Sequence, residues 1–442
     1  MAAGQIGQML LGFSDSVMVG KLGVVPLAAS AFANGIISVL LVAGIGLLAS
    51  VSIMASQAFG AGQPREAGEV MRQGIGIAAV TGLLIGGFIT LGLGGLAWFK
   101  QPPEVLAAAR PFLVIVGWSV GPALVWQCLK QFCEALSRPL VPMLTMFAAV
   151  VLNVLLSWVF IYGHLGLPAL GLNGAAWATL ISRMLFMVVL FVVVVRSPHF
   201  YAALPLKWVA KVDWHGVRAQ LAIGLPVALQ LLAEVGAFAT AAVMTGWLGA
   251  EALAAHQVAI SYCAMTFMCP LGISIAVSVR VGQVVGAGDW SRVRTIGAGG
   301  LVMAMVLMGM FACVFAGAGT LLAGLFVREQ PVALLAGRLL GVAAIFQLFD
   351  GVQVVTAGAL RGLSDVRVPT AIAFFAYWAV ALPVCYLAGF GWHHGPLGVW
   401  WGLATGLTVA AVTLVWRFHI KTRPTGLAET TADVAAEFSR QV

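Results

Sequence analysis

The stretch VMVGKLGVVPLAA at residues 17–29 returns as VMTGWLGAEALAA at residues 243–255, so that Val17 aligns with Val243. In the same register QAFGAG at 57–62 matches QVVGAG at 283–288, and 16 of the 46 positions from 17 to 62 are identical without a gap. Self-similarity in one fixed register indicates a duplicated structural unit. The sequence therefore predicts two halves that share one fold.

The composition excludes most classes of soluble protein. Of 442 residues only 23 are basic and 15 acidic, so 9% are charged, while 61% are hydrophobic and the mean hydropathy is +1.03. Soluble domains are usually about 45–50% apolar. Soluble enzymes and nucleic-acid binders are therefore excluded, and a polytopic membrane protein is expected. The six cysteines lie in apolar stretches without CxxC spacing, which predicts neither a disulfide framework nor a metal site.

About twelve apolar runs are long enough to cross a bilayer as helices, which needs about 20 residues each. Open strand edges cannot face lipid and the alternation of a membrane barrel is missing, so we expect an all-α fold. Six spans in each half give both halves the same orientation, which predicts two parallel-repeat lobes of the kind that transporters use. The expected runs lie near 2–20, 27–56, 74–99, 105–132, 139–163, 168–195, 218–247, 252–279, 296–327, 331–360, 368–390 and 396–418.

The basic residues predict how the chain is oriented. If the N-terminus is cytoplasmic, 17 of the 23 basic residues, with Lys130 and Arg361 among them, belong to the loops and tail on that side, whereas five face the other side and Arg183 lies inside a span. An excess of Lys and Arg marks the cytoplasmic side of a membrane protein. Both termini are therefore expected in the cytoplasm.

We expect four parts along the chain. These are an N-terminal six-helix lobe at 1–196, a cytoplasmic linker at 197–217, a C-terminal six-helix lobe at 218–418 and a polar cytoplasmic tail at 419–442. In the repeat register Met1 aligns with Val227, so either the first helix is short or the natural start lies upstream. No cleavable signal pattern is visible.

Three carboxylates lie well inside expected spans: Asp15, Glu234 and Asp350. Such residues cost about 2.5–3.5 kcal/mol each on insertion scales and usually face a cavity where they serve ions or substrates. Desolvation favours a protonated carboxyl and a nearby cation favours an ionised one, so these groups could exchange a proton for another cation, as an antiporter must. Each carboxylate occurs in only one half of the repeat. Asp15 aligns with Ala241, Glu234 with Gln8 and Asp350 with Ala123.

Neutral oxygens accompany the acids in the fifth and sixth spans, where Asn153, Ser157, Asn173 and Thr179 lie. They suit a weakly bound cation, although hydrogen bonds between helices are an equal alternative. Arg183 either pairs with Asp15 or extends toward the membrane surface.

Two further polar features have structural interpretations. Lys130 and Glu134 are spaced i, i+4 and predict a local ion pair. We interpret His256, which follows LAA at a span boundary, as structural.

The remaining motifs limit the function. No nucleotide-binding loop occurs, so energy has to come from an ion gradient or another subunit. A membrane-embedded enzyme lacks support because no HExxH or nucleophile motif is present. A channel is disfavoured because each half carries membrane-embedded acids that the other half lacks. A flippase for anionic lipid-linked precursors is the main alternative, but it should line its cleft with several basic residues.

The motifs FSDSVMVGKLGVVPLAA at 13–29, AEVGAFATAAVMTGWLGAEALAAHQVA at 233–259 and FQLFDGVQVVTAGALRGLSDVRVPT at 346–370 resemble the multidrug and toxic compound extrusion (MATE) family, in its NorM-like branch. The resemblance covers nearly the whole chain. It implies two six-helix lobes around a V-shaped cleft, and export of cationic and amphipathic drugs by alternating access in exchange for Na⁺ or H⁺, with no enzymatic activity.

The resemblance also assigns roles to residues. It implies that Glu234 and Asp350 bind the coupling cation, with transient Na⁺ binding, and that Asp15, Asn153 and Thr179 form the polar cluster of the N-terminal lobe. Ser157 stands where one branch carries a second acid, and Phe346 stands where a tyrosine is common.

The expected setting of the protein follows. We expect a multi-pass monomer of the bacterial inner membrane, in contact with lipid, with drugs as its small-molecule partners. Neither a cofactor nor a nucleic-acid partner is expected. The drug spectrum and the choice between Na⁺ and H⁺ stay open.

Overall fold

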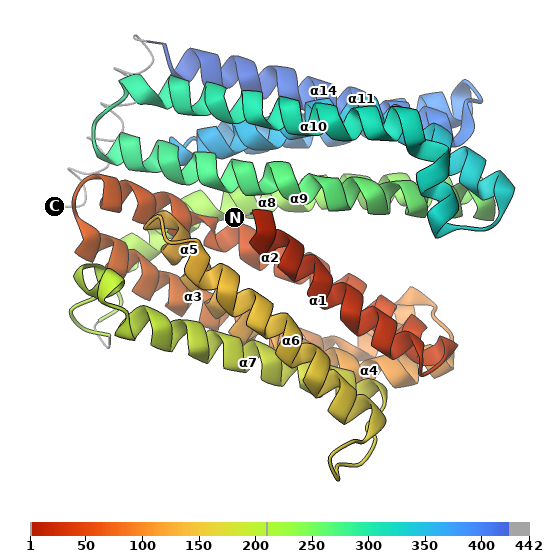
Figure 1. The fold of residues 1–442 in the computed structure, drawn as a ribbon, viewed down its shortest axis with the longest axis horizontal. Coiled ribbons are helices and arrows are strands. Elements are labelled where there is room, and N and C mark those ends of the chain that lie inside the picture. The colour runs from red at the N-terminus through yellow and green to blue at the C-terminus, as the bar shows by residue number, and fades with distance from the viewer. Residues whose placement is uncertain (1, 209–210, 424–442) are drawn as a thin grey trace. The chain divides into compact units, whose positions relative to one another are not determined.

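The computed structural model describes residues 2–208 and 211–423, and all regular structure within these ranges is helical. The helices divide into two compact units, the first comprising residues 3–228 and the second beginning at Leu229. Figure 1 shows the helices in the colours of their sequence order. The all-α expectation is confirmed, whereas most of the expected tail, from 424 onward, lies outside the described residues.

The first unit contains seven α-helices and two short 3₁₀ segments within the described chain. They are α1 (Ala2–Gly20), α2 (Val24–Gly60), α3 (Pro64–Leu91), η1 (Gly92–Phe99), α4 (Pro103–Trp118), α5 (Val120–Ala135), α6 (Leu140–Tyr162), α7 (Leu172–Arg196) and η2 (Pro198–Ala203). The run expected at 105–132 is interrupted at Ser119, where α4 ends and α5 begins.

Helix α8 (Trp214–Trp247) begins in the first unit and continues into the second. Its first turns pack on the first unit, where Gln220 Nε2 donates to the carbonyl of Val70 over 2.9 Å. A Cβ on Gly224 would overlap the carbonyl of Leu47, so this part of α8 needs a residue without a side chain to approach α2. The linker bounds expected before it, 197–217, stay a proposal.

The second unit continues with three long helices, a broken span and a final helix. They are α9 (Ala250–Gly286), α10 (Ser291–Phe326), α11 (Gln330–Gly362), α12 (Arg367–Phe374), the π-helical η3 (Phe375–Ala381), α13 (Leu382–Tyr386), the π-helical η4 (Leu387–Gly391) and α14 (Gly395–Lys421). The run expected at 368–390 is thus one span in which the π-helical η3 interrupts the α-helix once and the π-helical η4 ends it.

Eleven of the described helical segments are long and apolar enough to cross a membrane, and α1 adds an apolar helix of 19 residues. Large apolar side chains on α3 face outward, with Leu84 and Phe88 each 68% exposed. Exposure of that kind suits a lipid environment. The expectation of about twelve membrane-spanning helices is confirmed.

The repeat is visible in the backbone. Helices α2 and α9 begin and end at positions that align in the repeat register, Val24 with Ala250 and Gly60 with Gly286. Gly23 and Gly249 precede them with φ values of 118° and 116°, a region that an L side chain rarely adopts. The two halves therefore turn at these matching places in the same way.

A second pair of matching turns follows later in each half. Ser137 and Ser364, which the sequence aligns one position further along, share φ values of 59° and 58°. Both residues come just after a helix, α5 in the first unit and α11 in the second. The duplication thus extends beyond the stretch in which identities are frequent.

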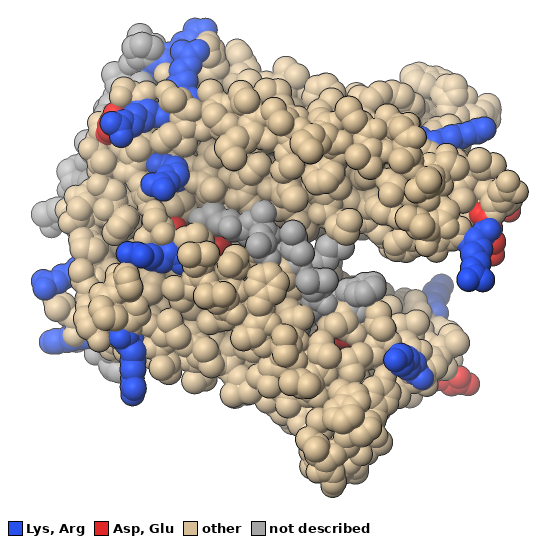
Figure 2. Space-filling model, viewed as in Figure 1, with Lys and Arg blue, Asp and Glu red and all other residues tan. Residues whose placement is uncertain are grey.

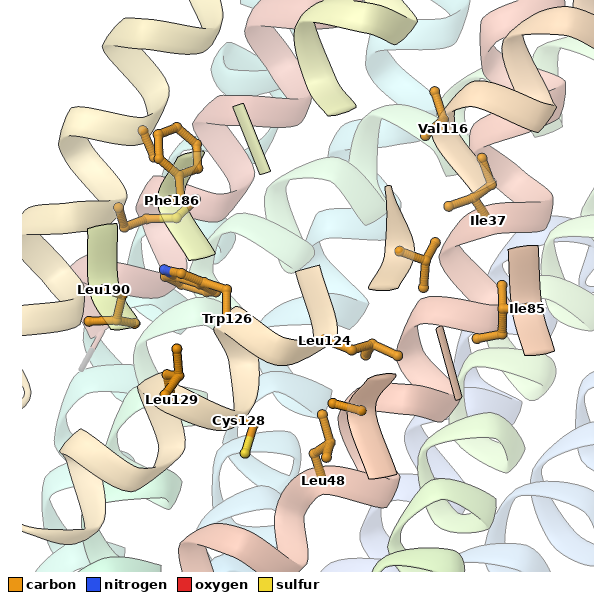
Figure 3. Packing of buried hydrophobic residues seen from close by; sticks show 14 of the residues in the cluster. Ile37, Leu48, Ile85, Val116, Leu124, Trp126, Cys128, Leu129, Phe186 and Leu190 are labelled. Carbon is orange, nitrogen blue, oxygen red and sulfur yellow. The ribbon is translucent and has the colours of Figure 1, made fainter. Parts of the chain in front are cut away.

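The core of the first unit surrounds α5, as Figure 3 shows. Leu124 of α5 packs toward α2, whereas Trp126 lies beside Phe186 and Leu190 of α7. On the α3 side a Cβ on Gly82 would overlap the Cα of Gly121, so the two backbones touch there. Close backbone contact between small residues is a common source of helix association in membranes.

Charged side chains lie mainly toward the ends of the helices, and the long middle of the visible surface of each unit carries almost none (Figure 2). This distribution leaves a nearly uncharged band of surface on each unit. The charged groups that lie inside the helices are therefore few, and they define the candidate sites.

Candidate functional site

The acid of the first unit, Asp15, is held by hydroxyl groups from two other helices. Ser157 Oγ of α6 donates to Asp15 Oδ1 over 3.4 Å, and Thr179 Oγ1 of α7 donates to Asp15 Oδ2 over 3.3 Å. Ser157 is fully buried and Thr179 is 8% exposed. Three of the residues singled out in the sequence thus meet at one point.

Two amides lie on the same helices as these hydroxyls. Asn153 is one turn before Ser157 and fully buried, and neither its Oδ1 nor its Nδ2 has a hydrogen-bond partner in the described chain. The Oδ1 atom of Asn173 on α7 is also buried without a partner there. These unused polar atoms are available to a ligand, since buried polar groups are normally paired.

Arg183 binds a residue of the same unit within the helical bundle. Its Nη1 donates to Ser119 Oγ over 2.8 Å at the junction between α4 and α5, while its charge attracts that of Asp15. Because Ser119 Oγ donates in turn to the carbonyl of Val116 over 2.6 Å, the hydroxyl is used as donor and acceptor together. Arg183 is therefore a nearby counter-charge for Asp15 that is fixed by a different helix.

In the second unit Glu234 of α8 and Asp350 of α11 come close enough for their charges to repel. The side-chain amide of Gln353 donates a hydrogen bond to the Glu234 carboxylate. Asp350 is only 7% exposed. The two acids singled out for this half of the sequence thus belong to one cluster.

Arg361 belongs to the same cluster, contrary to its expected place in a cytoplasmic loop. It lies in the last turn of α11, with its Nε atom buried, and its charge attracts that of Glu234. Its Nη2 donates to Gln230 Oε1 over 3.4 Å, one helical turn before Glu234 on α8. The cluster therefore contains two negative charges and one positive charge.

Neutral oxygens complete the cluster. Gln347 Nε2 donates to Thr266 Oγ1 over 2.6 Å, which leaves Gln347 Oε1 buried and unpartnered within the described chain. The same holds there for Gln353 Oε1 and for the hydroxyl of Tyr377, whose surroundings include both carboxylates. Carboxylates beside neutral oxygens are the ligands that hard cations prefer. Among the described residues no group of three His, Cys, Asp or Glu side chains could hold a metal ion.

Sequence reasoning missed Gln353, Tyr377 and Arg361. Helical spacing was an unused signal, because Arg361 follows Asp350 by about three helical turns and therefore shares a face of α11 with it. Tyr377 comes from the π-helical η3 and has no such periodic marker. His256, interpreted as structural, accepts a hydrogen bond on Nδ1 from Trp400 Nε1 over 3.1 Å and is 2% exposed.

Comparison with known proteins gives consistent matches. The MatE family model matches residues 1–159 and 226–387, one segment in each half. The "probable multidrug resistance protein NorM" of Bradyrhizobium diazoefficiens is 36% identical over 430 residues, covering 95% of this chain and 91% of that protein. The protein of the same name from Rhodopseudomonas palustris is 35% identical over 433 residues, covering 96% and 90%.

Solved structures show the same fold. The eukaryotic MATE transporter AtDTX14 superposes with a TM-score of 0.87 at 22% identity, covering 97% of this chain and 96% of that one. The Vibrio cholerae MATE transporter VcmN in its bent form gives 0.87 at 22% identity, covering 97% and 95%. Because the family model matches most of the chain and the two NorM relatives span nearly all of it, this protein belongs to the MATE family.

Proposed function

We propose that this chain is a secondary-active multidrug efflux antiporter, which exports cationic and amphipathic compounds in exchange for Na⁺ or H⁺ by alternating access. As a member of a transporter family it is a transporter and not an enzyme. The observation that carries the proposal is the pair of acids Glu234 and Asp350, held with unpartnered oxygens inside an apolar unit. Relatives named for multidrug resistance support the drug as cargo.

The charges of the second unit set how many cations it can take. With Glu234 and Asp350 ionised and Arg361 positive, the cluster keeps one net negative charge, which a single Na⁺ or H⁺ neutralises. Uncompensated charge in a low-dielectric interior is costly, so the cluster should alternate between a bound coupling ion and a bound cationic drug. Arg361 compensates Glu234, which leaves Asp350 as the carboxylate that exchanges its partner.

The first unit has a different charge balance. Asp15 is negative and Arg183 is positive, so this cluster is neutral before any cation arrives. Two hydroxyls already donate to Asp15, and they stabilise its ionised form. We infer that a proton arriving at Asp15 would weaken these contacts and loosen α1 from α6 and α7, whereas a sodium ion would be bound weakly.

The flippase alternative receives no support. Lys130 is buried and Arg183 and Arg361 are partly buried, but each of the three attracts a neighbouring carboxylate. No surplus of positive charge is therefore available for an anionic lipid carrier at these positions. The relatives are named for multidrug resistance.

We also propose a bacterial inner-membrane location, with both termini in the cytoplasm and the protein active as a monomer. The basic residues support this orientation even after Lys130 and Arg361 are removed from the cytoplasmic set, because 15 then face five. Cysteine labelling tests the orientation. Arg65→Cys and Arg110→Cys are each made in a protein without the native cysteines, and intact cells are labelled with a maleimide that cannot cross the membrane. Only the Arg110→Cys protein should react, and labelling of Arg65→Cys alone would contradict it.

Efflux of ethidium from proteoliposomes tests the function, with a Na⁺ gradient and a pH gradient imposed separately. Glu234→Gln and Asp350→Asn should each lower gradient-driven efflux about tenfold or more, because the first change leaves the charge of Arg361 uncompensated and the second removes the carboxylate that exchanges its cation. Glu251→Gln is the matched control, since Glu251 lies in the exposed first turn of α9. Unchanged efflux in both acid variants would refute the site assignment, and efflux that ignores both gradients in the parent protein would refute antiport.

A further inference from the structure

A second group of buried polar side chains lies on α5, away from Asp15 and its partners. Trp126, Gln127, Lys130, Gln131 and Glu134 are each between 3% and 9% exposed. Their spacing of i, i+1, i+4, i+5 and i+8 places all five within about 140° of the helix circumference. This polar face of α5 has no role in the proposed coupling site.

The Lys130 ammonium group is surrounded by groups that recognise cations. Its Nζ atom donates to Gln5 Oε1 of α1 over 2.8 Å and lies 5.7 Å from the centre of the Trp126 ring. The charge of Glu134, one turn further along α5, attracts it. An aromatic ring within about 6 Å, a carboxylate and an amide oxygen together form the usual chemistry of an organic-cation site.

The Trp126 ring is held in place by the apolar core. In Figure 3 it lies beside Phe186 and Leu190 of α7, and its indole nitrogen is buried without a hydrogen-bond partner in the described chain. A buried indole N–H usually has a hydrogen-bond partner. Because this one has none there, we infer that the position selects tryptophan for its ring and not for its N–H group. The ring therefore presents a fixed aromatic surface to Lys130.

Two unused acceptors flank Lys130 on the same helix. Gln127 Oε1 and Gln131 Oε1 are both buried and have no hydrogen-bond partner among the described residues. A lysine has three donors on a flexible stem, so its ammonium group could move from Gln5 and Trp126 to these oxygens. The polar face thus offers two alternative sets of contacts for the Lys130 ammonium group.

The repeated half does not contain this arrangement. In the register that aligns Ser137 with Ser364, Trp126, Lys130 and Glu134 correspond to Gln353, Ala357 and Arg361. The lysine is lost and the acid is replaced by a base. A group required only for the fold of each half would be present in both.

We propose that the polar face of α5, together with Gln5, is a binding site for an aromatic organic cation, and that the Lys130 ammonium group occupies it as an internal ligand until such a cation arrives. The arriving cation takes the face of Trp126 and the charge of Glu134, and Lys130 moves to the oxygens of Gln127 and Gln131. The nature of the ligand rests on the proposed function. By the proposed topology α5 ends at the cytoplasmic side, from which an exporter loads.

Binding of ethidium to the purified full chain in detergent, measured by fluorescence anisotropy, tests the site. All variants carry Asp350→Asn, which disables the proposed coupling site so that it does not contribute to the measured binding. Lys130→Met should tighten binding about tenfold, because the internal competitor for the aromatic ring and the carboxylate is gone. Lys21→Met is the control, with affinity unchanged, because Lys21 is exposed and lies outside the site. No tightening in Lys130→Met would overturn the proposal.

A second measurement separates a binding role from a structural one. Glu134→Gln should weaken ethidium binding more in the Lys130→Met protein than in the parent, because Lys130 no longer offsets the carboxylate. Equal effects in the two backgrounds would also overturn the site. Loss of efflux in Asp350→Asn together with tighter ethidium binding in Lys130→Met supports both proposals. Tighter binding in Lys130→Met with unchanged efflux in Asp350→Asn supports this site and contradicts only the coupling site.

Discussion

Replacing Arg361 with methionine should destabilise the second unit, because methionine keeps an apolar stem and removes the charge that compensates Glu234. The Nε atom of Arg361 is buried and its Nη2 donates to Gln230, so the charge and this hydrogen bond are lost together. Removing one partner of a buried ion pair costs about 3–5 kcal/mol. Arg361 and Glu234 are both partly exposed and attract each other without a direct ion pair, so we expect a loss below that range, of about 1–3 kcal/mol, as for a lost hydrogen bond at a charged group.

The double variant Arg361→Met with Glu234→Gln isolates the interaction. Neutralising Glu234 removes the uncompensated charge, so the double variant should be more stable than Arg361→Met alone, with a coupling energy of about 1–3 kcal/mol. Unfolding curves in mixtures of dodecyl maltoside and sodium dodecyl sulfate measure these differences. Arg338→Met serves as the control, since Arg338 is an exposed residue of the same helix. Additive effects of the two substitutions would refute the pairing of Arg361 with Glu234.

Two other sets of substitutions probe the first unit. Gly82→Ala should lower stability in the same unfolding assay, because the new Cβ would overlap the backbone of α5. Gly76→Ala on the same helix is the control, since its Cβ meets nothing within 4 Å, and it should be neutral or slightly stabilising. Equal stability of the two variants would contradict the close α3–α5 contact. Ser157→Ala and Thr179→Val should each lower gradient-driven ethidium efflux about fivefold, the effect of losing one hydrogen bond of about 1 kcal/mol, and less than Asp15→Asn does. Loss of activity in the hydroxyl variants as complete as in Asp15→Asn would show that their role is not limited to one contact each.

The sequence was sufficient for the parts of the fold that local pattern determines. Apolar runs longer than a bilayer predicted the helices, and the identities from 17 to 62 predicted a shared fold for the two halves, with which the matching backbone angles at Gly23 and Gly249 agree. The meeting of Asp15 with Ser157 and Thr179 was also indicated, because polar residues inside apolar helices usually face one another or a cavity.

Arg361 shows what composition could not decide. A charge at the end of an apolar run looks the same whether the helix stops before it or continues through it, and α11 ends at Gly362, just beyond the expected end of the run. Whether such a side chain turns inward depends on an acid from another helix, here Glu234, which is distant in the sequence. Lys130 was expected to form a local ion pair with Glu134, and its hydrogen bond goes instead to Gln5 of α1, which is equally distant along the chain.

The π-helical segments η3 and η4 were not predicted from the sequence either, although Pro383 lies between them. They lie where α14 approaches closely, because a Cβ on Gly398 would overlap the carbonyl of Ala388 in η4 and one on Gly406 would overlap the side chain of Ala381 in η3. The hydrogen-bond period of this span therefore depends on its neighbour. Tyr377, which η3 places near the two acids, could be assigned to the cluster only from three-dimensional packing.

The path of α8 has a consequence for how the protein is made. Its first turns belong to the first unit, through Gln220 on Val70 and Gly224 on Leu47, although they follow the other helices of that unit in the chain. When the ribosome has made the chain up to residue 196, the first unit therefore still lacks the contacts of residues 214–228 with α2 and α3. The opening of the second half thus completes the first, which makes the order of membrane insertion part of the folding of this transporter.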